Sequence, residues 1–493
     1  MLKVIRYAIL FFTISMFFLS IVFSNSNILL LAVCSMLFHN LWYSCERFSE
    51  RSIFFAFNIT FFTFLVARLV VKPLTGYYDK YNNNYYGLDF DTESVVWFIF
   101  ISLFISLLFL FFGYCLIKNN KKIKSKKLKI YDKLSVKNIS IVSKILFYFT
   151  YVFNVLVLLD KAKFSSSYGY MELYVSYSSS YPLWFVKLAD MCPSALFVYL
   201  GTLPSKRKCF LPLLLYLSLG VLSLFVGQRN NFVLNILIVL IYFCLRNITD
   251  KNEKWFGKRE IISCIFTFPI LIFLLNAVSY LRIGAKVNQS SVIDVISEFF
   301  YKQGTSVNLI GYAETLANRF PEGKSYSFGK IIDFFNNNVI TQTLINTPKY
   351  SPQTIESALY GTSFADSVSY ILSPYRYLHG WGYGSSYIAE LYLDFGYFGI
   401  IVGNFVYGII LALMTKLFKR SILGVWLSLY ITRSLLYAPR SSFTAFIVST
   451  FSLVNILTLF IILIGCIILD KKKYHPKLSN TFSKSTIDRN ISS

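Results

Sequence analysis

Long apolar segments separated by short polar segments run along most of this chain. A membrane-spanning helix needs about 20 mostly apolar residues to cross roughly 30 Å of hydrocarbon. On that criterion the pattern predicts about twelve spans. They are expected at residues 6–24, 28–45, 53–71, 94–117, 139–159, 182–203, 210–227, 231–246, 261–281, 387–415, 421–437 and 443–469. The pattern therefore predicts an all-α polytopic membrane protein.

Basic residues alternate between the loops that join these segments. Loop 118–138 carries nine lysines against the single acidic residue Asp132. Further basic clusters lie at 206–208, 254–259, 416–420 and 471–473. Cytoplasmic loops of membrane proteins carry an excess of Lys and Arg, so we expect these loops and both termini in the cytoplasm.

The same pattern divides the chain into four parts. Residues 1–282 form an N-terminal bundle of about nine spans, and 283–386 form one large loop on the opposite, outer side. Apolar spacing predicts helices in that loop near 291–302, 305–319 and 327–345. Residues 387–470 hold about three more spans, and 471–493 are expected to be a disordered cytoplasmic tail.

Composition excludes several classes of function. The chain is 55% hydrophobic and only 15% charged, which is too apolar for a soluble protein of this length. The net charge of +24 follows from the basic loops, so we expect the lipid bilayer and no nucleic acid as a partner. The eight cysteines show no CxxC or Cys/His spacing and are expected to be free thiols.

The catalytic motifs of several enzyme classes are absent from the sequence. It contains no outward DxD motif, no Walker sequence, no HExxH and no GxSxG. This argues against nucleotide-sugar transfer, ATP hydrolysis and serine hydrolysis, and the sequence predicts neither a metal nor a cofactor.

Arginines on the outer side are exceptions to the charge rule and therefore candidates for function. The set comprises Arg68, Arg229, Arg282, Arg376, Arg433 and Arg440. A guanidinium group is always charged and binds phosphate oxygens in a two-pronged manner. A cluster of arginines would suit a lipid pyrophosphate, whereas a single arginine at a span end can simply anchor the helix at the interface.

Three titratable side chains near the start of the tenth span are candidates for proton transfer. His379 is the only histidine of the outer portion, and it suits a general base or a structural residue in a glycine turn. Glu390 and Asp394 are four residues apart and share one helix face, where each is a candidate base or partner of an outer arginine. Simple packing is the alternative for Glu390.

Glycines surround these residues. Gly380, Gly382 and Gly384 are expected to bend the backbone before the helix rather than to form a phosphate loop, because GWGYG is not GxGxxG and no strand precedes it. Gly399 and Gly403 form a GxxxG pair inside a span, a pattern typical of helix packing.

Two local motifs resemble those of the Wzy-type polymerases, which join lipid-linked oligosaccharide repeat units into bacterial surface polysaccharide. One is GQRNN at 227–231, and the other is RYLHGWGYGSSYIAELYLDFGYFG at 376–399. The resemblance implies a GT-C-like glycosyltransferase of the bacterial inner membrane, with its active site on the periplasmic face. It also implies undecaprenyl-pyrophosphate-linked oligosaccharide as substrate, no metal, and a chain-length regulator protein as partner.

The resemblance also suggests how the chemistry is divided. Arg229, Arg376 and Glu390 are the positions that match the family, and the remaining outer arginines would help to bind pyrophosphate. A carboxylate or His379 would accept the proton of the attacking hydroxyl. Outer aromatic residues would stack on sugar rings, namely Trp381, Tyr383, Tyr168 and Tyr170.

Two alternatives stay open on the sequence alone. A flippase or other transporter of lipid-linked oligosaccharide would also have about twelve spans, but it would more naturally show charged residues within its spans and two similar halves. An O-antigen ligase, which transfers the finished chain to a lipid core, is the second enzymatic alternative; the chain lacks a clear version of the histidine-centred loop motif of the ligases, but His379 keeps this alternative open. The unequal halves and the single large loop favour the polymerase over the transporter.

The charge alternation makes a topological prediction. Reporter fusions at Asn336 and Lys126 should give opposite readings, because the first lies in the outer loop and the second in the Lys-rich loop. Paired periplasmic and cytoplasmic reporters at each site measure this. The same reading at both sites would contradict the predicted orientation.

Overall fold

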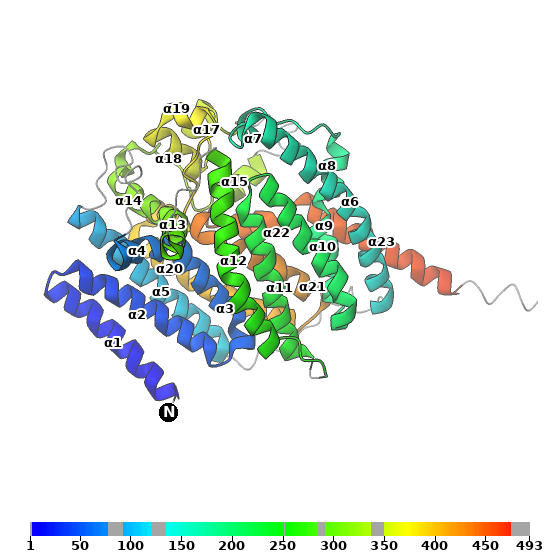
Figure 1. Ribbon diagram of the computed structural model, residues 1–493, viewed down its shortest axis with the longest axis horizontal. Coiled ribbons are helices and arrows are strands. Elements are labelled where there is room, and N and C mark those ends of the chain that lie inside the picture. The colour runs from blue at the N-terminus through cyan, green and yellow to red at the C-terminus, as the bar shows by residue number, and fades with distance from the viewer. Residues whose placement is uncertain are drawn as a thin grey trace, which may run out of the picture.

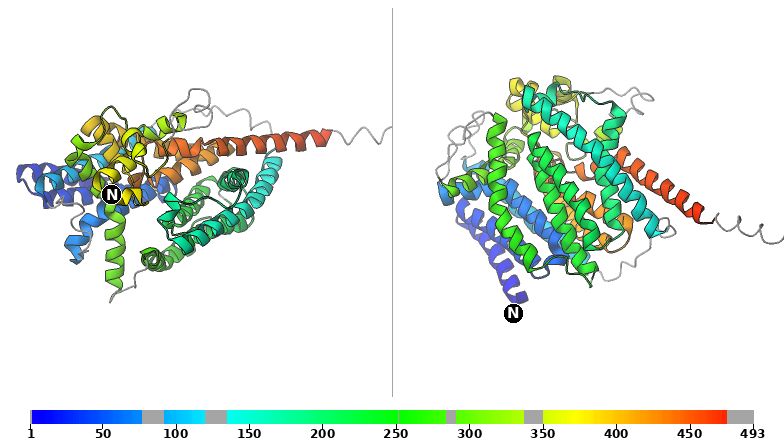
Figure 2. Two further views of the ribbon diagram at one scale, coloured as in Figure 1. Left: turned by 90° about the horizontal axis from the view of Figure 1, so that it is seen from above. Right: turned by 45° about the vertical axis from the view of Figure 1, so that its right-hand side comes forward.

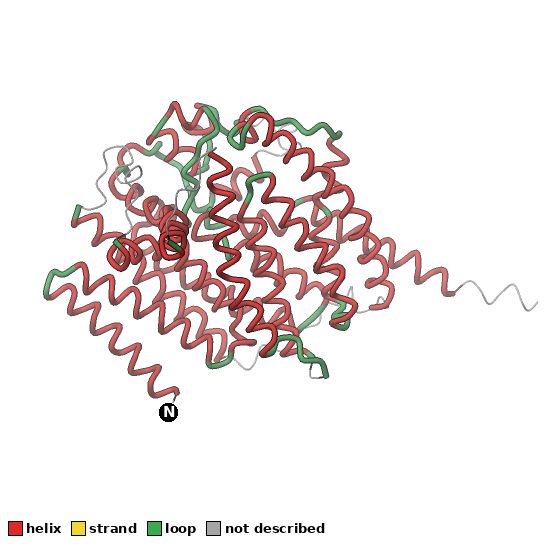
Figure 3. The backbone as a smooth tube through the Cα atoms, in the orientation of Figure 1, coloured by secondary structure: helices red, strands yellow, loops and turns green. Residues whose placement is uncertain are grey.

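The computed structural model describes residues 2–76, 92–119, 135–250, 252–283, 291–336 and 350–474. The regular structure of these residues is helical, and Figure 3 shows helices joined by short loops. Most of the Lys-rich loop, most of 72–93, residues 337–349 and the tail from 475 lie outside the described residues. The prediction of an all-α fold is confirmed for the part that the structure describes.

Eleven helices of the described chain are long and apolar enough to cross a membrane. They are α1 (Leu2–Val22), α2 (Ser26–Cys45), the continuous α3, η1 and α4 (Phe48–Phe61, Phe62–Val66, Ala67–Thr75), α5 (Glu93–Asn119), α6 (Val136–Tyr168), α8 with α9 (Leu183–Asp190, Cys192–Gly201), α10 (Lys206–Phe225), α11 (Arg229–Thr249), α12 (Lys258–Ile283), α20 (Tyr387–Phe418) and α22 with α23 (Ala445–Thr450, Leu453–Tyr474). Each matches a span expected from the sequence. The chain is a multi-pass membrane protein.

The remaining expected span, 421–437, is a shorter helix. Helix α21 (Ile422–Leu435) has 14 residues and rises only about 21 Å, less than the hydrocarbon thickness. It packs among α9, α11 and α20, and the Trp426 indole N–H donates to Ser194 Oγ of α9 at 2.9 Å. Because its neighbours surround it, α21 does not have to match the membrane thickness by itself.

Short helices gather at one end of the bundle. They are α13 (Val292–Gln303), η4 (Gly304–Ser306), α14 (Val307–Thr315), η5 (Ala317–Arg319), α15 (Gly329–Asn336), α17 (Ile355–Tyr360), α18 (Phe364–Leu372) and α19 (Pro374–Leu378). We call residues 291–336 and 350–386 the cap. Figure 1 places α17, α18 and α19 beside α7 (Glu172–Val175) at the top of the molecule.

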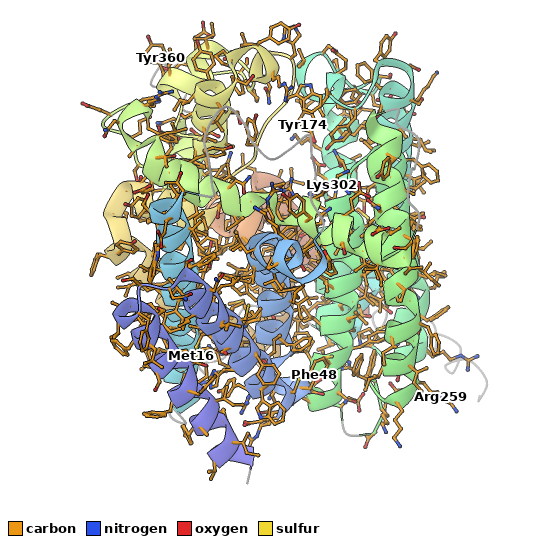
Figure 4. The ribbon with its side chains drawn as sticks, turned by 60° about the vertical axis from the view of Figure 1, so that its left-hand side comes forward. Met16, Phe48, Tyr174, Arg259, Lys302 and Tyr360 are labelled. Carbon is orange, nitrogen blue, oxygen red and sulfur yellow. The ribbon has the colours of Figure 1, made fainter. Side chains whose placement is uncertain are left out.

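The charged loops and the cap lie at opposite ends of the molecule. Figure 4 shows Tyr360 and Tyr174 at one end and Arg259, from a basic loop, at the other. The two views of Figure 2 show α23 extending away from the bundle. This arrangement agrees with the alternation of charge along the chain, and the side of the membrane that each end faces stays a prediction.

The most extensive helix contact in the bundle joins α5 and α20. A Cβ atom at Gly113 would lie 2.0 Å from the Phe405 carbonyl oxygen, and one at Gly408 would lie 2.1 Å from the Leu110 carbonyl oxygen. Only glycine allows two helix backbones to approach so closely, as in other membrane helix pairs. Asn404 Nδ2 donates to Ser106 Oγ of α5 at 3.0 Å and adds a polar contact to this crossing.

Helix α20 is broken at Gly396, where φ is 61° and ψ is −151°. The part before the break folds back along the part after it. The Tyr387 hydroxyl donates to Asn404 Oδ1 at 2.6 Å, although in a straight helix these residues would lie about 25 Å apart. The continuous helix expected over 387–415 is therefore interrupted, because this backbone conformation is open essentially to glycine alone.

The GxxxG pair of α20 accommodates the folded-back segment. A Cβ atom at Gly399 would lie 2.3 Å from the Leu391 carbonyl oxygen, and one at Gly403 would lie 2.3 Å from the Leu391 side chain. The packing role expected for Gly399 and Gly403 is confirmed. The residue that packs against both glycines is Leu391, which belongs to the same helix rather than to a neighbouring one.

A second apolar core joins the cap to the folded-back segment. The rings of Phe320 and Phe364 stack with centroids 5.4 Å apart. Tyr312 and Val368 of the cap belong to the same buried cluster, and so does Ala389, which comes from α20. Burial of each large apolar side chain contributes about 1.5–3 kcal/mol. The cap therefore packs directly on the start of α20.

The crossing of α5 and α20 predicts a position that cannot accept a side chain. Gly408→Leu should lower the thermal unfolding midpoint of the purified protein, because the contacting atoms are backbone and overpacking costs about 1–3 kcal/mol even where side chains can shift. Val406→Leu, at an exposed position of the same helix, is the matched control and should leave the midpoint unchanged. Equal midpoints for the two variants would contradict the close crossing.

Candidate active site

A cavity of about 220 Å³ lies where the cap meets the bundle. Its lining residues are Met171, Thr305, Asn308, Leu309, Tyr312, Arg376, Trp381, Gly382, Tyr383 and Arg440. The structure thus brings together four side chains that the sequence predicted for substrate binding or catalysis: Arg376, Trp381, Tyr383 and Arg440.

The two arginines of the cavity are not neutralised by carboxylates. None of the ion pairs between described residues involves Arg376 or Arg440. The guanidinium carbon of Arg376 lies 5.9 Å from the centre of the Trp381 ring, within reach of a weak cation–π contact. Because no carboxylate is among the described residues that line the cavity, the two guanidinium groups favour an anion that accepts two-pronged hydrogen bonds.

A bent backbone presents these side chains. Gly380 and Gly384 have φ values of 85° and 80°, which glycine adopts without strain, so the bend expected before α20 is confirmed. The Tyr383 backbone N–H donates to Ser369 Oγ of α18 at 3.0 Å and fixes the segment against the cap. Arg440 comes from the opposite wall, at the end of η6 (Ala438–Arg440).

Glu390 lies behind the cavity and connects two of its walls. Its side chain is fully buried. It accepts a hydrogen bond from Ser385 Oγ at 2.6 Å and another from the Phe443 backbone N–H at 2.9 Å. Ser385 follows Tyr383 closely in sequence, and Phe443 follows Arg440. Glu390 therefore holds the segments that carry these two cavity residues.

Asp394 attaches the cap to α20. It accepts hydrogen bonds from Ser325 Oγ at 2.9 Å, the Tyr326 N–H at 3.0 Å and the Ser327 N–H at 2.8 Å, and a further one from Ser327 Oγ. Thr444 Oγ1 donates to the Ser327 carbonyl oxygen at 2.9 Å. The loop at 325–327 is thereby fixed between α20 and the segment that follows η6.

Asp160 holds a third wall in the same way. It accepts hydrogen bonds from the Tyr177 hydroxyl and from Ser180 Oγ, each at 2.7 Å. The loop that it anchors contains Met171, a lining residue of the cavity. A Cβ atom at Gly380 would lie 2.6 Å from the Met171 carbonyl oxygen, so this loop packs closely on the glycine-rich bend.

These three carboxylates are therefore satisfied by hydroxyl and amide donors. The sequence expectation paired Glu390 or Asp394 with an outer arginine. Both carboxylates accept hydrogen bonds from neutral hydroxyl and backbone N–H groups instead, and the ion pairs between described residues include neither. These carboxylates therefore do not neutralise Arg376 or Arg440, and the positive charge of the two arginines is available to an anionic ligand.

His379 lies on the exposed surface of the cap. Its Nδ1 lies 2.7 Å from the Tyr375 carbonyl oxygen, and its ring packs on the Tyr375 ring with centroids 4.2 Å apart. It is not among the lining residues of the cavity. The role of proton acceptor for His379 stays a prediction.

The other outer arginines lie on neighbouring helices. Arg229, the first residue of α11, donates from Nη1 to the Leu275 carbonyl oxygen of α12 at 3.1 Å. Arg433 near the end of α21 donates from Nη2 to Asn231 Oδ1 of α11 at 3.1 Å. Arg282 lies in the last turn of α12, and its side chain lies outside the described residues. A part in pyrophosphate binding stays a prediction for all three.

A buried ion pair fixes α13 beside the cavity wall. Glu298 pairs with Lys302 and accepts hydrogen bonds from the Tyr280 hydroxyl at 2.6 Å and from Asn276 Nδ2 at 3.1 Å. Burial raises the pKa of the Glu298 carboxyl, but these hydrogen bonds outweigh it and hold the pKa below its usual value. Figure 4 shows Lys302 between the bundle and Tyr174 of the cap end.

Arg68 is the remaining outer arginine. Its guanidinium carbon lies 4.1 Å from the centre of the Tyr301 ring, and its Nη1 lies 3.5 Å from the Tyr301 carbonyl oxygen. These contacts tie α4 to α13, the helix that leads into the cavity wall. Pyrophosphate binding and anchoring of the helix end both stay predictions for Arg68.

Five lining residues were missed from the sequence: Met171, Thr305, Asn308, Leu309 and Tyr312. Asn308 and Tyr312 are four residues apart and lie on one face of α14. A polar residue and an aromatic residue at that spacing on one helix face were a usable signal. Thr305 and Met171 carried none, because their position depends on how the cap folds.

Comparison with known protein families identifies one match that covers most of the chain. The family model of the O-antigen polysaccharide polymerase Wzy matches residues 5–473. The match includes the transmembrane helices, the cap and every lining residue of the cavity. No curated protein and no solved structure matches the chain.

Proposed function

Because the chain belongs to the O-antigen polysaccharide polymerase Wzy family, it polymerises lipid-linked oligosaccharide repeat units in the membrane, and we propose that the cavity at Arg376 and Arg440 is where the units are joined. The observation that carries this proposal is the pair of arginines in a cavity also lined by Trp381 and Tyr383, neither arginine being ion-paired with a carboxylate of the described part of the chain. The match does not favour the flippase or the ligase.

The two guanidinium groups would bind the diphosphate of the donor. In the transfer step the acceptor hydroxyl attacks the anomeric carbon and gives up its proton to a base, the role predicted for a carboxylate or His379. A new glycosidic bond forms, and the bond to the diphosphate oxygen breaks as negative charge develops there. Fixed positive groups aimed at that developing charge stabilise the transition state more than the ground state. This is a role that a metal ion fills in many other sites, and here we assign it to arginine.

Aromatic rings and positioned loops would complete the site. Trp381 and Tyr383 offer flat apolar faces for sugar rings. Glu390 fixes the segments that carry Tyr383 and Arg440 relative to each other through its hydrogen bonds to Ser385 and Phe443. The carrier is undecaprenyl pyrophosphate in this proposal, and the cap end faces the periplasm from the inner membrane. A chain-length regulator stays a predicted partner.

The arginines provide the direct test of this proposal. Arg376→Ala and Arg440→Ala should each reduce polymer formation by roughly 10²–10³-fold in cells that lack the native enzyme, because each removes charge stabilisation of the leaving group. Arg→Lys should restore little, since a point charge does not replace a planar two-pronged donor. Gel analysis of extracted polysaccharide at equal protein level measures both effects.

Arg259→Ala is the matched control for these variants. Arg259 lies at the end of the molecule away from the cap (Figure 4), so this variant should give a normal polysaccharide ladder. Full-length polymer from both the Arg376 and the Arg440 variants would show that the cavity is not the site of transfer.

Two variants of Glu390 distinguish a positioning role of this residue from a role in proton transfer. A glutamine side chain can still accept from the Phe443 N–H and donate to Ser385 Oγ, whereas alanine removes both contacts. We therefore expect Glu390→Gln to keep most of the polymer ladder and Glu390→Ala to lose it, at equal protein level. Loss of the ladder in both variants would instead support the role of general base that the sequence suggested.

A further inference from the structure

A second hollow lies on the cap beside the cavity. It has a volume of about 300 Å³ and is open to the surface. The residues that matter for its chemistry are Arg319, Leu359, Ser367, Tyr370 and Pro374. We call it the cap groove.

The cap groove and the cavity share a wall. Helix α18 contributes Ser367 and Tyr370 to the groove, while Ser369 Oγ of the same helix accepts the hydrogen bond that holds Tyr383 at the cavity. Helix α19 contributes Pro374 to the groove and Arg376 to the cavity, and these residues are only about 3 Å apart along the helix axis. A ligand that leaves the cavity over this wall enters the groove directly.

The chemistry of the groove suits a chain of sugars. Leu359 and Pro374 supply apolar surface, and the Tyr370 ring is held edge to face by Tyr377 with centroids 6.0 Å apart. Arg319 is exposed and takes part in no ion pair between described residues. Apolar faces with a few polar groups are typical of sites that bind a ligand by both its apolar and its hydrogen-bonding edges.

The size of the cavity requires such an extension. Pockets that enclose a drug-sized ligand measure about 300–1,000 Å³, so the 220 Å³ of the cavity cannot enclose an oligosaccharide repeat unit. The donor of a polymerase carries many such units. Most of its sugars must therefore lie outside the cavity while its reducing end reacts.

We propose that the cap groove binds the glycan of the growing chain a few sugars away from the reacting end. This inference rests on the proposed function, because it takes the cavity as the position of the diphosphate. Because the groove contacts only a long chain, the long chain binds at the donor position more tightly than a single repeat unit does. The groove therefore promotes repeated elongation of the same chain.

Removal of the groove contacts should shorten the polymer. Arg319→Ala and the double variant Arg319→Ala/Tyr370→Ala should shift the polysaccharide ladder to short chains, while products of the first joining steps persist. Arg319 is exposed, so its single variant tests the groove without disturbing the fold of the cap. Tyr360→Ala is the control, because Tyr360 is an exposed tyrosine of the cap that is not among the lining residues of the groove.

A binding measurement tests the same inference without turnover. Purified protein in nanodiscs, titrated with lipid-free oligosaccharide, should bind several repeat units more tightly than one, and the double variant should lose that difference. A normal ladder and unchanged binding in the groove variants would overturn the assignment of the groove. Failure of the proposed site would look different, because the Arg376 and Arg440 variants would then make normal polymer.

Discussion

The reversal of α20 at Gly396 is the constraint on which the candidate site depends. It returns Tyr387 to Asn404 and thereby buries Glu390 against Phe443. The same turn presents Asp394 to the loop at 325–327 of the cap. In a straight helix these two carboxylates would project from one face of a membrane span, and neither wall of the cavity would be held as it is.

The distribution of charge around the cavity follows from that geometry. Buried carboxylates are costly unless they are hydrogen-bonded, and here hydroxyl and backbone N–H groups satisfy them. The serines at 325, 327 and 385 supply much of this donor capacity. Because these acids are satisfied locally, they do not pair with Arg376 or Arg440, and the positive charge of the two arginines faces the cavity, as the proposed binding of a diphosphate requires.

Hydropathy predicted the membrane helices well and the site only partly. The spans follow from long apolar runs, which water and lipid select without reference to neighbouring segments. The break in α20 could not be read in this way, because Gly396 lies in an apolar run that also suits a continuous helix. Arg376, Trp381, Tyr383 and Arg440 were predicted from their residue types, but their separation from Arg229, Arg433 and His379 depends on tertiary packing. The wall formed by α14 was missed although Asn308 and Tyr312 share one helix face, a spacing that the sequence does show.

The loop anchored by Asp160 has a consequence for how substrate preference can diverge. This loop contributes Met171 to the cavity, yet it is held by hydrogen bonds between Asp160 and residues 177–180. The hydrogen bonds that hold this wall thus come from residues 160–180, which are separate in sequence from Arg376 and Arg440. If the cavity is the proposed site, substitutions between Tyr170 and Tyr174 would reshape one wall and leave the segments of Arg376 and Arg440 unchanged. Under that proposal, evolution, or an engineer who grafts this loop from a related enzyme, would have a route to a different accepted glycan that leaves the proposed anion-binding arginines in place.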